Sequence, residues 1–578
     1  MTVAVLTASI RRSAAIRSFD GGQLLLAILA VYVALLCVLP LGRLLMEALV
    51  PGGQAFDWAL IERVLSSRAV RTATLQTIEA SLGATMVSLL LGTALALVIG
   101  VADVRFKSLV VFLALLPMLI PAQISALAWL ELMGPSSPIL SPLGLAPGAG
   151  TRNPLYSREG IILLMGIEHS TIVFLAVLAG LRSVPADLVE AARAAGARPL
   201  RIVFTVILPL LRPALIAGGA LAFVSAIGNF GIPALLGIPG RYTMLTTLIY
   251  QRLNGFGPSI LGEVAVLALV LAVLAAMGLL VQAWAMRGRK VVIMGGGIGS
   301  GSFFRLRRWR LPIEAGLWAV LLLISILPLV ALGATSIVQA LGVPLTLDSW
   351  TWRHYEAVLS SATIKRAFGN SFLLALGAAL VSMAVAVPIA YYLHCRRSAL
   401  ARFLNSVADA PYALPGIVLS IAFILVLLRP LPVFGIGLYG TIWIILAAYL
   451  ARFLALALRP SLAGMQQIDT ALEEAARMAG ARSLRRLATI VLPLAAPAAA
   501  AGAILIFMSA FSELTVSVLL WSSGHETIGV MVFNMYDEGN ATGASAVAVL
   551  TVLATLLSAA VLSLLARRLP KGILPWQA

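Results

Sequence analysis

The sequence is poor in charged residues, cysteine and histidine, and each shortage excludes a class of protein. Only 11% of its 578 residues are charged, whereas a soluble globular domain has roughly 25%. The two cysteines, Cys37 and Cys395, lie far apart, so the sequence offers neither a disulfide framework nor a cysteine metal site. The four histidines are also dispersed, and no metal-binding or catalytic constellation stands out.

Apolar residues dominate instead, at 61% of the chain, and the mean hydropathy is +1.02. Apolar runs of about 20 residues, each long enough to cross a hydrocarbon layer of roughly 30 Å as a helix, alternate with breaks rich in proline, glycine and arginine. The sequence therefore predicts an all-α, polytopic membrane protein of about 12 transmembrane helices. The expected spans are 23–46, 75–101, 108–133, 160–181, 205–228 and 260–285, then 313–338, 370–394, 402–428, 438–458, 491–518 and 543–566.

The positive charge fits a membrane topology better than a nucleic-acid partner. The net charge is +18, but the 41 lysines and arginines are concentrated in short segments between apolar runs. If the N-terminus is cytoplasmic, most of them fall on the cytoplasmic side, as the positive-inside rule requires. We therefore expect a lipid bilayer as surroundings, no nucleic-acid partner, and both termini in the cytoplasm. Arg11, Arg12 and Arg17 precede the first run, which is too long for the core of a signal peptide, so we expect it to be uncleaved.

One polar segment interrupts the apolar runs twice, near 186–209 and near 470–493, and we call these segments the two Glu-Ala-Ala loops. The first copy contains Glu190, Ala191, Ala192 and Gly196 and ends in Leu208-Pro209; the second contains Glu474, Ala475, Ala476 and Gly480 and ends in Leu492-Pro493. All corresponding positions are 284 residues apart. A carboxylate near a helix start, small alanines and a glycine predict a short helix, a sharp turn and a return helix in the cytoplasm.

The repeat extends over most of the chain. At a separation of 294 residues Trp58 corresponds to Trp352, while Pro117 and Pro121 correspond to Pro411 and Pro415; from about residue 178 onward the separation is 284. Because a unit of six helices has an even number of crossings, two copies share one orientation and form a parallel repeat. We expect a first half over 1–286, a flexible cytoplasmic linker rich in glycine and arginine over 287–312, and a second half over 313–578.

The two Glu-Ala-Ala loops resemble the EAA loops of binding-protein-dependent ABC importer permeases. The whole chain is similar to two fused MetI-like domains of the type I importer fold. The segments that follow Asn229 and Ser512 are similar to those of ferric-iron-type permeases, a subgroup that also includes permeases for thiamine and phosphonates. The resemblance implies a bacterial inner-membrane protein that binds two copies of a cytoplasmic ATPase through these loops. It also implies that a periplasmic binding protein delivers the solute.

The four lysines support a separate ATPase. A Walker A phosphate loop requires glycine directly before its lysine, whereas the residues before the lysines here are Phe106, Arg289, Ile364 and Pro570. The glycine tract of the linker has no G-x-G-x-x-G spacing and follows no predicted strand. We therefore expect this chain to be non-catalytic and to hold no cofactor or metal, with ATP and Mg²⁺ bound by the partner ATPase.

Polar residues inside or at the ends of predicted spans are candidates for the transport path, because burying them in lipid is costly. These candidates are Asn229, Glu513, Ser225, Ser509, His169, Arg452 and Tyr412. Glu513 and Tyr412 suit a hard cation such as ferric iron, whereas Arg452 and His169 suit a small anionic or phosphorylated solute. Hydrogen bonds between helices are the structural alternative for each of them.

Two other classes of protein stay open at this point. An ion-gradient-driven secondary transporter also uses six-plus-six parallel repeats; it predicts transport without an ATPase and offers no reason for two Glu-Ala-Ala loops. A receptor or scaffold is the third possibility.

Overall fold

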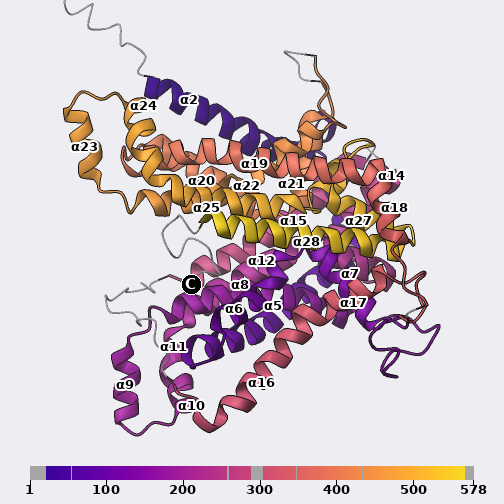
Figure 1. Ribbon diagram of the computed structural model, residues 1–578. Coiled ribbons are helices and arrows are strands. Elements are labelled where there is room, and N and C mark those ends of the chain that lie inside the picture. The colour runs from indigo at the N-terminus through magenta and orange to yellow at the C-terminus, as the bar shows by residue number, and fades with distance from the viewer. Residues whose placement is uncertain are drawn as a thin grey trace, which may run out of the picture. The chain divides into compact units, whose positions relative to one another are not determined.

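A computed structural model describes residues 21–53, 55–256, 260–287, 304–346, 348–430 and 435–566, and every named element among them is helical (Figure 1). In this part of the chain nine helices are long and apolar enough to cross a membrane, and the number rises to 12 if each of three bent helix pairs is one span. All 12 coincide with the spans expected from the sequence. The prediction of an all-α, polytopic membrane fold is confirmed.

The nine single spans and the three bent pairs have the following bounds. The single spans are Gly21–Leu49, Arg68–Val101, Arg158–Leu181, Leu261–Ala285, Arg307–Ser336, Ala362–His394, Ile442–Met465, Ser483–Phe511 and Ala541–Val561. The bent pairs are Lys107–Leu119 with Ala122–Met133, Pro199–Leu210 with Arg212–Gly228, and Ala399–Ala413 with Gly416–Leu427.

Repeated prolines produce the two sharpest bends. Helices α6 (Lys107–Leu119) and α7 (Ala122–Met133) meet at 102°, and α20 (Ala399–Ala413) and α21 (Gly416–Leu427) meet at 109°. Pro121 and Pro415 are the N-cap residues after these breaks. Proline has no N–H to continue a helix and pushes the preceding residue out of the α region, so the same residue makes the same bend in both copies of the repeat.

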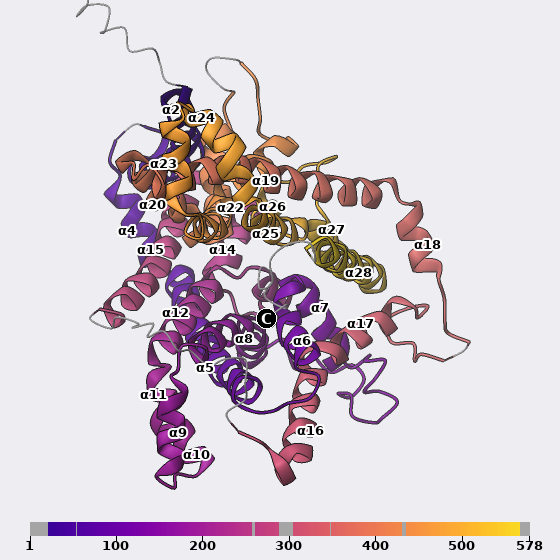
Figure 2. The ribbon, with the colours of Figure 1, turned by 60° about the vertical axis from the view of Figure 1, so that its left-hand side comes forward.

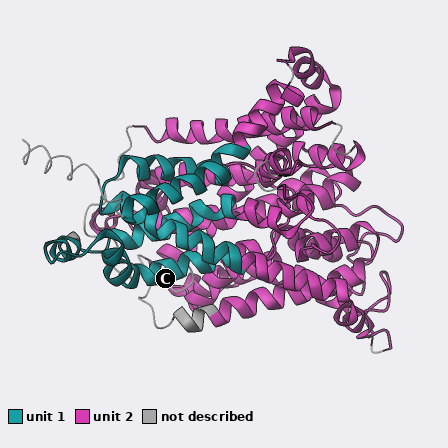
Figure 3. Ribbon diagram, turned by 90° about the horizontal axis from the view of Figure 1, so that it is seen from above, with its two compact units in different colours: residues 1–40, 376–412, 450–507 teal, residues 41–375, 413–449, 508–578 magenta. Residues whose placement is uncertain are grey.

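Two compact units make up the chain, and Figure 3 shows them in different colours. Unit 1 draws on residues 1–40, 376–412 and 450–507, and unit 2 on residues 41–375, 413–449 and 508–578. Each unit therefore contains segments from both expected halves. The half boundaries themselves stay a prediction. Of the expected linker, residues 288–303 lie outside the described residues, as do Arg11, Arg12 and Arg17.

Within unit 1, the first helix of the chain packs against the second Glu-Ala-Ala loop. Helix α2 (Gly21–Val33) lies beside α24 (Ser483–Arg486) in both Figures 1 and 2. The hydroxyl of Tyr392 donates a hydrogen bond to the carbonyl oxygen of Gly22 at 2.8 Å. A Cβ on Gly22 would lie 3.1 Å from the side chain of Ser483, so glycine permits this close approach.

Within unit 2, the segment that follows the expected linker packs against the first half. The N–H of Leu306 donates to Asp103 Oδ1 at 2.8 Å, and Arg310 at the start of α16 (Arg310–Leu321) forms an ion pair with the same carboxylate. The hydrogen bond from Leu306 and the charge of Arg310 lower the pKa of Asp103. Further along, the hydroxyl of Ser325 donates to the carbonyl oxygen of Leu113 at 3.0 Å. The first span of the second half is thereby joined to α6.

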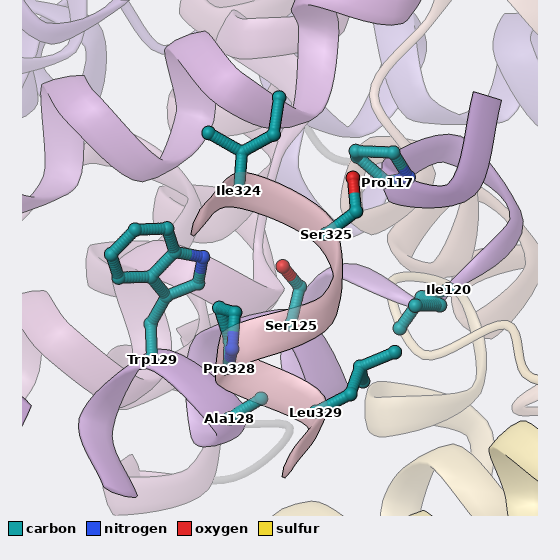
Figure 4. A pocket seen from close by; sticks show the side chains of 9 residues that line it. All are labelled: Pro117, Ile120, Ser125, Ala128, Trp129, Ile324, Ser325, Pro328 and Leu329. Atoms are coloured by element: carbon teal, nitrogen blue, oxygen red, sulfur yellow. The ribbon is translucent and has the colours of Figure 1, made fainter. Parts of the chain in front are cut away.

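A small cavity lies beside the bend between α6 and α7 (Figure 4). Its lining residues are Pro117, Ile120, Ser125, Ala128, Trp129, Ile324, Ser325, Pro328 and Leu329. The space open to a water-sized sphere is about 10 Å³, at the lower limit for a single water molecule. The cavity is too small to be part of a solute path.

Candidate functional site

Each Glu-Ala-Ala loop consists of a short helix, a glycine turn and a return helix. The first contains α9 (Ala186–Ala194) and α10 (Pro199–Ile202), and the second contains α23 (Thr470–Met478) and α24. Figure 2 shows α9 and α10 extending beyond the end of α12 (Arg212–Gly228), the span that follows them. The first helix of each loop, α9 or α23, lies in none of the apolar spans, so a second protein can reach it.

The turn is the same hydrogen-bonded motif in both loops. The N–H of Ala197 donates to the carbonyl oxygen of Ala192 at 3.0 Å, and in the second loop Ala481 donates to Ala476 at 3.0 Å. The N–H groups of Gly196 and Gly480 bond to the carbonyl oxygens three residues earlier, at 2.9 and 3.0 Å. Both glycines have positive φ, +79° and +82°. This pair of bonds is a Schellman motif, which ends a helix and favours glycine.

The motif residues are presented in the same way in both copies. Glu190 and Glu474 are exposed, as are Ala191 and Ala475, and the second alanines, Ala192 and Ala476, are half-buried. Gly196 and Gly480 are also exposed. Met478, in the last turn of α23, is 89% exposed. Each loop therefore offers a narrow helix with a carboxylate and small side chains on its open face.

The second loop is held by a buried ion pair that the sequence analysis missed. Glu473 Oε1 lies 2.8 Å from Arg486 Nε, and both side chains are at most 10% exposed. The Nε–H does not point at an acceptor, so this contact is an ion pair without a well-aligned hydrogen bond. Tyr391 adds a hydrogen bond from its hydroxyl to Glu473 Oε1 at 3.1 Å, and Arg486 Nη1 donates to the carbonyl oxygen of Ala481 at 2.5 Å.

The first loop has apolar residues at the positions of that ion pair. Val189 corresponds to Glu473 and Ile202 to Arg486, and both are buried, at 0% and 1% exposed. The first loop also has a contact of its own, because the guanidinium of Arg193 lies over the ring of Phe304 at 5.6 Å from its centroid. The signal for this difference was present in the sequence, as a charged pair aligned with an apolar one.

Of the predicted path residues, the structure places Asn229 against the carboxylate of Glu168. Asn229, the C-cap residue of α12, donates from Nδ2 to Glu168 Oε2 at 2.8 Å, and its Oδ1 accepts the N–H of Ile232 at 3.2 Å. Glu168 belongs to α8 (Arg158–Leu181). The pair brings a carboxylate and an amide together near the end of α12, within unit 2.

Glu513, the counterpart of Asn229, has a local structural role. Its carboxylate accepts the N–H of Val516 at 2.8 Å and the N–H of Ser517 at 3.2 Å, and it also bonds the hydroxyl of Thr515. These groups form the start of the short helix α26 (Ser517–Leu520), where a carboxylate is favourable. The carboxylate is therefore occupied within its own segment.

The other path candidates lie in separate places. Ser225 is half-buried in α12, and Ser509 is exposed in α25 (Leu492–Phe511). His169 is buried in α8, and its Nδ1 has no hydrogen-bond partner among the described residues. In unit 1, Tyr412 is 49% exposed, and Nη1 of Arg452 in α22 (Ile442–Met465) is a buried atom with no hydrogen-bond partner in the described part of the chain.

A metal site is not apparent in the residues that the structure describes. Among them, no group of three or more His, Cys, Asp or Glu side chains is placed to hold a metal ion.

Sequence reasoning missed one buried polar contact near the end of α25: Gln123 Nε2 donates to the carbonyl oxygen of Ser512 at 3.0 Å. A single buried glutamine carries no repeat or motif signal that would have singled it out.

Comparison with known proteins finds one family model twice in the chain. The model is described as the binding-protein-dependent transport system inner membrane component, and it matches residues 88–286 and 386–574. The two matches contain the two Glu-Ala-Ala loops. The repeat read from the sequence therefore corresponds to two copies of one domain.

Three similar proteins illustrate the range of names among the relatives. A probable ABC transporter permease protein, y4fN, of Sinorhizobium fredii is 26% identical over 560 residues, which are 95% of this chain and 96% of that protein. The ferric transport system permease protein FbpB of Actinobacillus pleuropneumoniae is 23% identical over 430 residues, 74% of this chain and 61% of that protein. A putative 2-aminoethylphosphonate transport system permease protein, PhnU, of Salmonella choleraesuis is 29% identical over 221 residues, 37% of this chain and 75% of that protein.

Proposed function

Because this chain belongs to the family of binding-protein-dependent transport system inner membrane components, we propose that it forms the translocation path of an ATP-driven importer in a bacterial inner membrane. It is an ABC transporter permease with two fused domains, and its family acts in transport rather than as an enzyme. The path opens alternately to the two sides of the membrane. Both termini are cytoplasmic, on the side where the arginine-rich segments lie.

The two Glu-Ala-Ala loops bind two copies of a cytoplasmic ATPase. The observation that carries this assignment is the duplicated geometry: the same Schellman turn and the same exposed glutamate recur 284 residues apart. One chain with two such loops needs two ATPase subunits, one for each loop. ATP and Mg²⁺ bind to those subunits, since no lysine of this chain follows a glycine.

The solute is ferric iron or a small anionic, phosphorylated molecule, delivered by a periplasmic binding protein. The names of two relatives, a ferric permease and a putative 2-aminoethylphosphonate permease, support these two chemistries. The side chains near the expected path support both as well: Glu168 with Asn229 suits a cation, and Arg452 suits an anion. An ion-gradient-driven transporter is disfavoured, because it gives the two loops no role.

Reconstitution with the ATPase encoded nearest to this chain tests the coupling assignment. Glu190→Lys together with Glu474→Lys reverses the exposed charge of both loops, and we expect loss of ATPase association and of binding-protein-stimulated ATP hydrolysis. The matched control is Glu62→Lys with Glu356→Lys. These two exposed glutamates are also repeat counterparts, 294 residues apart, but they lie in α4 (Trp58–Ser66) and α18 (Arg353–Ser360), outside the loops.

The control pair should leave both measurements unchanged. If the loop pair also left association and hydrolysis unchanged, the coupling assignment would be wrong.

The solute is tested separately, by thermal shift of the binding protein encoded beside the transporter. A shift with 2-aminoethylphosphonate and none with ferric iron would remove the cation from the proposal, and the reverse result would remove the anion.

A further inference from the structure

Two short helices, one after each span that follows a Glu-Ala-Ala loop, are counterparts in the repeat. In the first half, the N–H of Leu245, the first residue of α14 (Leu245–Phe256), donates to Thr77 Oγ1 at 2.8 Å. In the second half, the N–H of Ile528, the first residue of α27 (Ile528–Asp537), donates to Ser371 Oγ at 2.9 Å. Thr77 and Ser371 are separated by 294 residues, the repeat distance of that region. Each short helix is thus attached by an equivalent hydrogen bond to a long helix, α5 (Arg68–Val101) in the first half and α19 (Ala362–His394) in the second.

The two helices meet through equivalent residues. Counted from the two matching bonds, Tyr250 and Phe533 are each the sixth residue of their helix; they are 283 residues apart, one fewer than the separation of 284 in the preceding loops. Their ring centroids are 5.8 Å apart in an edge-to-face arrangement at 84°. Two equivalent residues of a parallel repeat contact each other only where the repeat axis passes between them. The path enclosed by two such halves follows this axis. All these residues belong to unit 2.

A third ring completes the cluster. Phe230 is fully buried and lies 5.2 Å from Tyr250 and 5.8 Å from Phe533 between ring centroids. It directly follows Asn229 at the end of α12, a span whose other end leads back to the first Glu-Ala-Ala loop. The cluster therefore lies at the side of the membrane opposite that loop.

The surroundings of the cluster are close-packed. A Cβ on Gly231 would lie 2.9 Å from the backbone nitrogen of Gln123, and a Cβ on Gly529 would lie 2.9 Å from the carbonyl oxygen of Glu513. Gln123 also bonds the carbonyl oxygen of Ser512. The backbone is therefore tightly packed next to Phe230 and at the start of α27.

We propose that Phe230, Tyr250 and Phe533 form the outer seal of the translocation path, closed in this structure and separated when the path opens outward. Apolar rings at a constriction exclude water and hydrated ions, and edge-to-face contacts hold the closed arrangement without covalent links. This inference rests on the proposed transport function and names the residues that close its outer end.

Alanine substitution tests the seal in the purified, full-length chain together with its ATPase. We expect Tyr250→Ala with Phe533→Ala to conduct ions across a planar bilayer in potassium chloride and to raise ATP hydrolysis without the binding protein roughly tenfold, as the closed state loses its ring contacts. Tyr250→Phe keeps the ring and should behave as the unmodified protein. Phe256→Ala removes an exposed aromatic side chain from the same helix, 63% exposed, and should also have no effect.

Cross-linking provides a second measurement that does not require the alanine variant to fold. Only Cys37 and Cys395 occur naturally, so Tyr250→Cys with Phe533→Cys can be placed in a background in which both are serine or alanine. We expect a short bifunctional thiol reagent to join the helices, to leave ATPase association intact and to abolish stimulation of ATP hydrolysis by the binding protein. Reduction of a cleavable reagent should restore stimulation.

The outcomes separate the two proposals. If the unmodified chain does not associate with the ATPase, the proposed function fails. If it does associate, but the alanine pair conducts no ions, or the cross-linked protein is still stimulated by the binding protein, the seal assignment is wrong and the transport function stands.

Discussion

The two Glu-Ala-Ala loops share one backbone and differ in what holds it. Both end their first helix with the same pair of hydrogen bonds and the same left-handed glycine. Behind that backbone the first loop buries Val189 and Ile202, whereas the second buries Glu473 against Arg486. The form of the loop therefore depends on the glycine turn, and the residues behind it can be apolar or charged.

This difference indicates how much a buried ion pair contributes. Taking two charges out of water is costly, and their attraction repays that cost only when the geometry and further hydrogen bonds are good. The second loop supplies one such bond from Tyr391, but Arg486 Nε–H lacks an aligned acceptor. The first loop adopts the same backbone conformation with the apolar residues Val189 and Ile202 at these two buried positions. The ion pair is thus an alternative to apolar packing, and it makes the second loop sensitive to the loss of either partner.

The largest expected effect comes from breaking the ion pair on one side. Glu473→Ala leaves the guanidinium of Arg486, 4% exposed, buried without its counter-charge, and we expect the stability of the second loop to fall by about 3–5 kcal/mol. Thermal unfolding of the purified protein and its association with the ATPase measure the loss. Val189→Ala, the corresponding truncation in the first loop, leaves no unpaired charge and should cost less.

A double substitution sharpens the same comparison. Glu473→Val with Arg486→Ile copies the residues of the first loop into the second and removes both charges together. We expect it to recover most of the stability that Glu473→Ala loses. A double variant as unstable as the single one would show that the two loops do not have interchangeable packing.

The glycine turn should respond equally in both loops. Nothing lies within 4 Å of a Cβ built on Gly196 or Gly480, so alanine there meets open space but has to adopt a positive φ. We expect each substitution to cost about 1–2 kcal/mol, by the penalty for a left-handed conformation. Gly333→Ala, in the helical interior of α17 (Leu327–Ser336) and also in open space, is the control and should be neutral or stabilising. Amide hydrogen exchange in α9 and α23 compares the two loops directly, and unequal losses would contradict the shared backbone.

The spans and the loops were predictable because their physical signals are local. Hydropathy marks the 12 spans, and Pro121 and Pro415 mark the two sharpest bends. The glycine turns follow from the residues of the loops alone. Each of these features depends on a few neighbouring residues, and the repeat supplies an independent copy of each.

The contacts between distant segments could not be read in this way. The packing of α2 against α24, the ring contact of Tyr250 with Phe533 and the hydrogen bond of Gln123 all join residues that lie hundreds of positions apart. Polarity alone also does not show what a side chain binds: Glu513 has the charge of a solute ligand, and its carboxylate accepts hydrogen bonds from the backbone of its own segment. A comparison of the two halves, position by position, detects the Glu473 and Arg486 substitutions, but not the contact between them.

The smallest expected effect concerns the start of the loop helices. Asp469, the N-cap residue of α23, accepts the N–H of Ala471 at 2.9 Å, whereas its counterpart Pro185 at the start of α9 makes no side-chain cap. Asp469→Ala should therefore destabilise α23 by about 1 kcal/mol, the usual cost of losing a side-chain cap. Pro185→Ala has no such bond to lose and should leave the cap of α9 as it is. Hydrogen exchange in the first turn of each helix measures both, and equal protection in the two variants would mean that the Asp469 bond adds nothing that the first loop lacks.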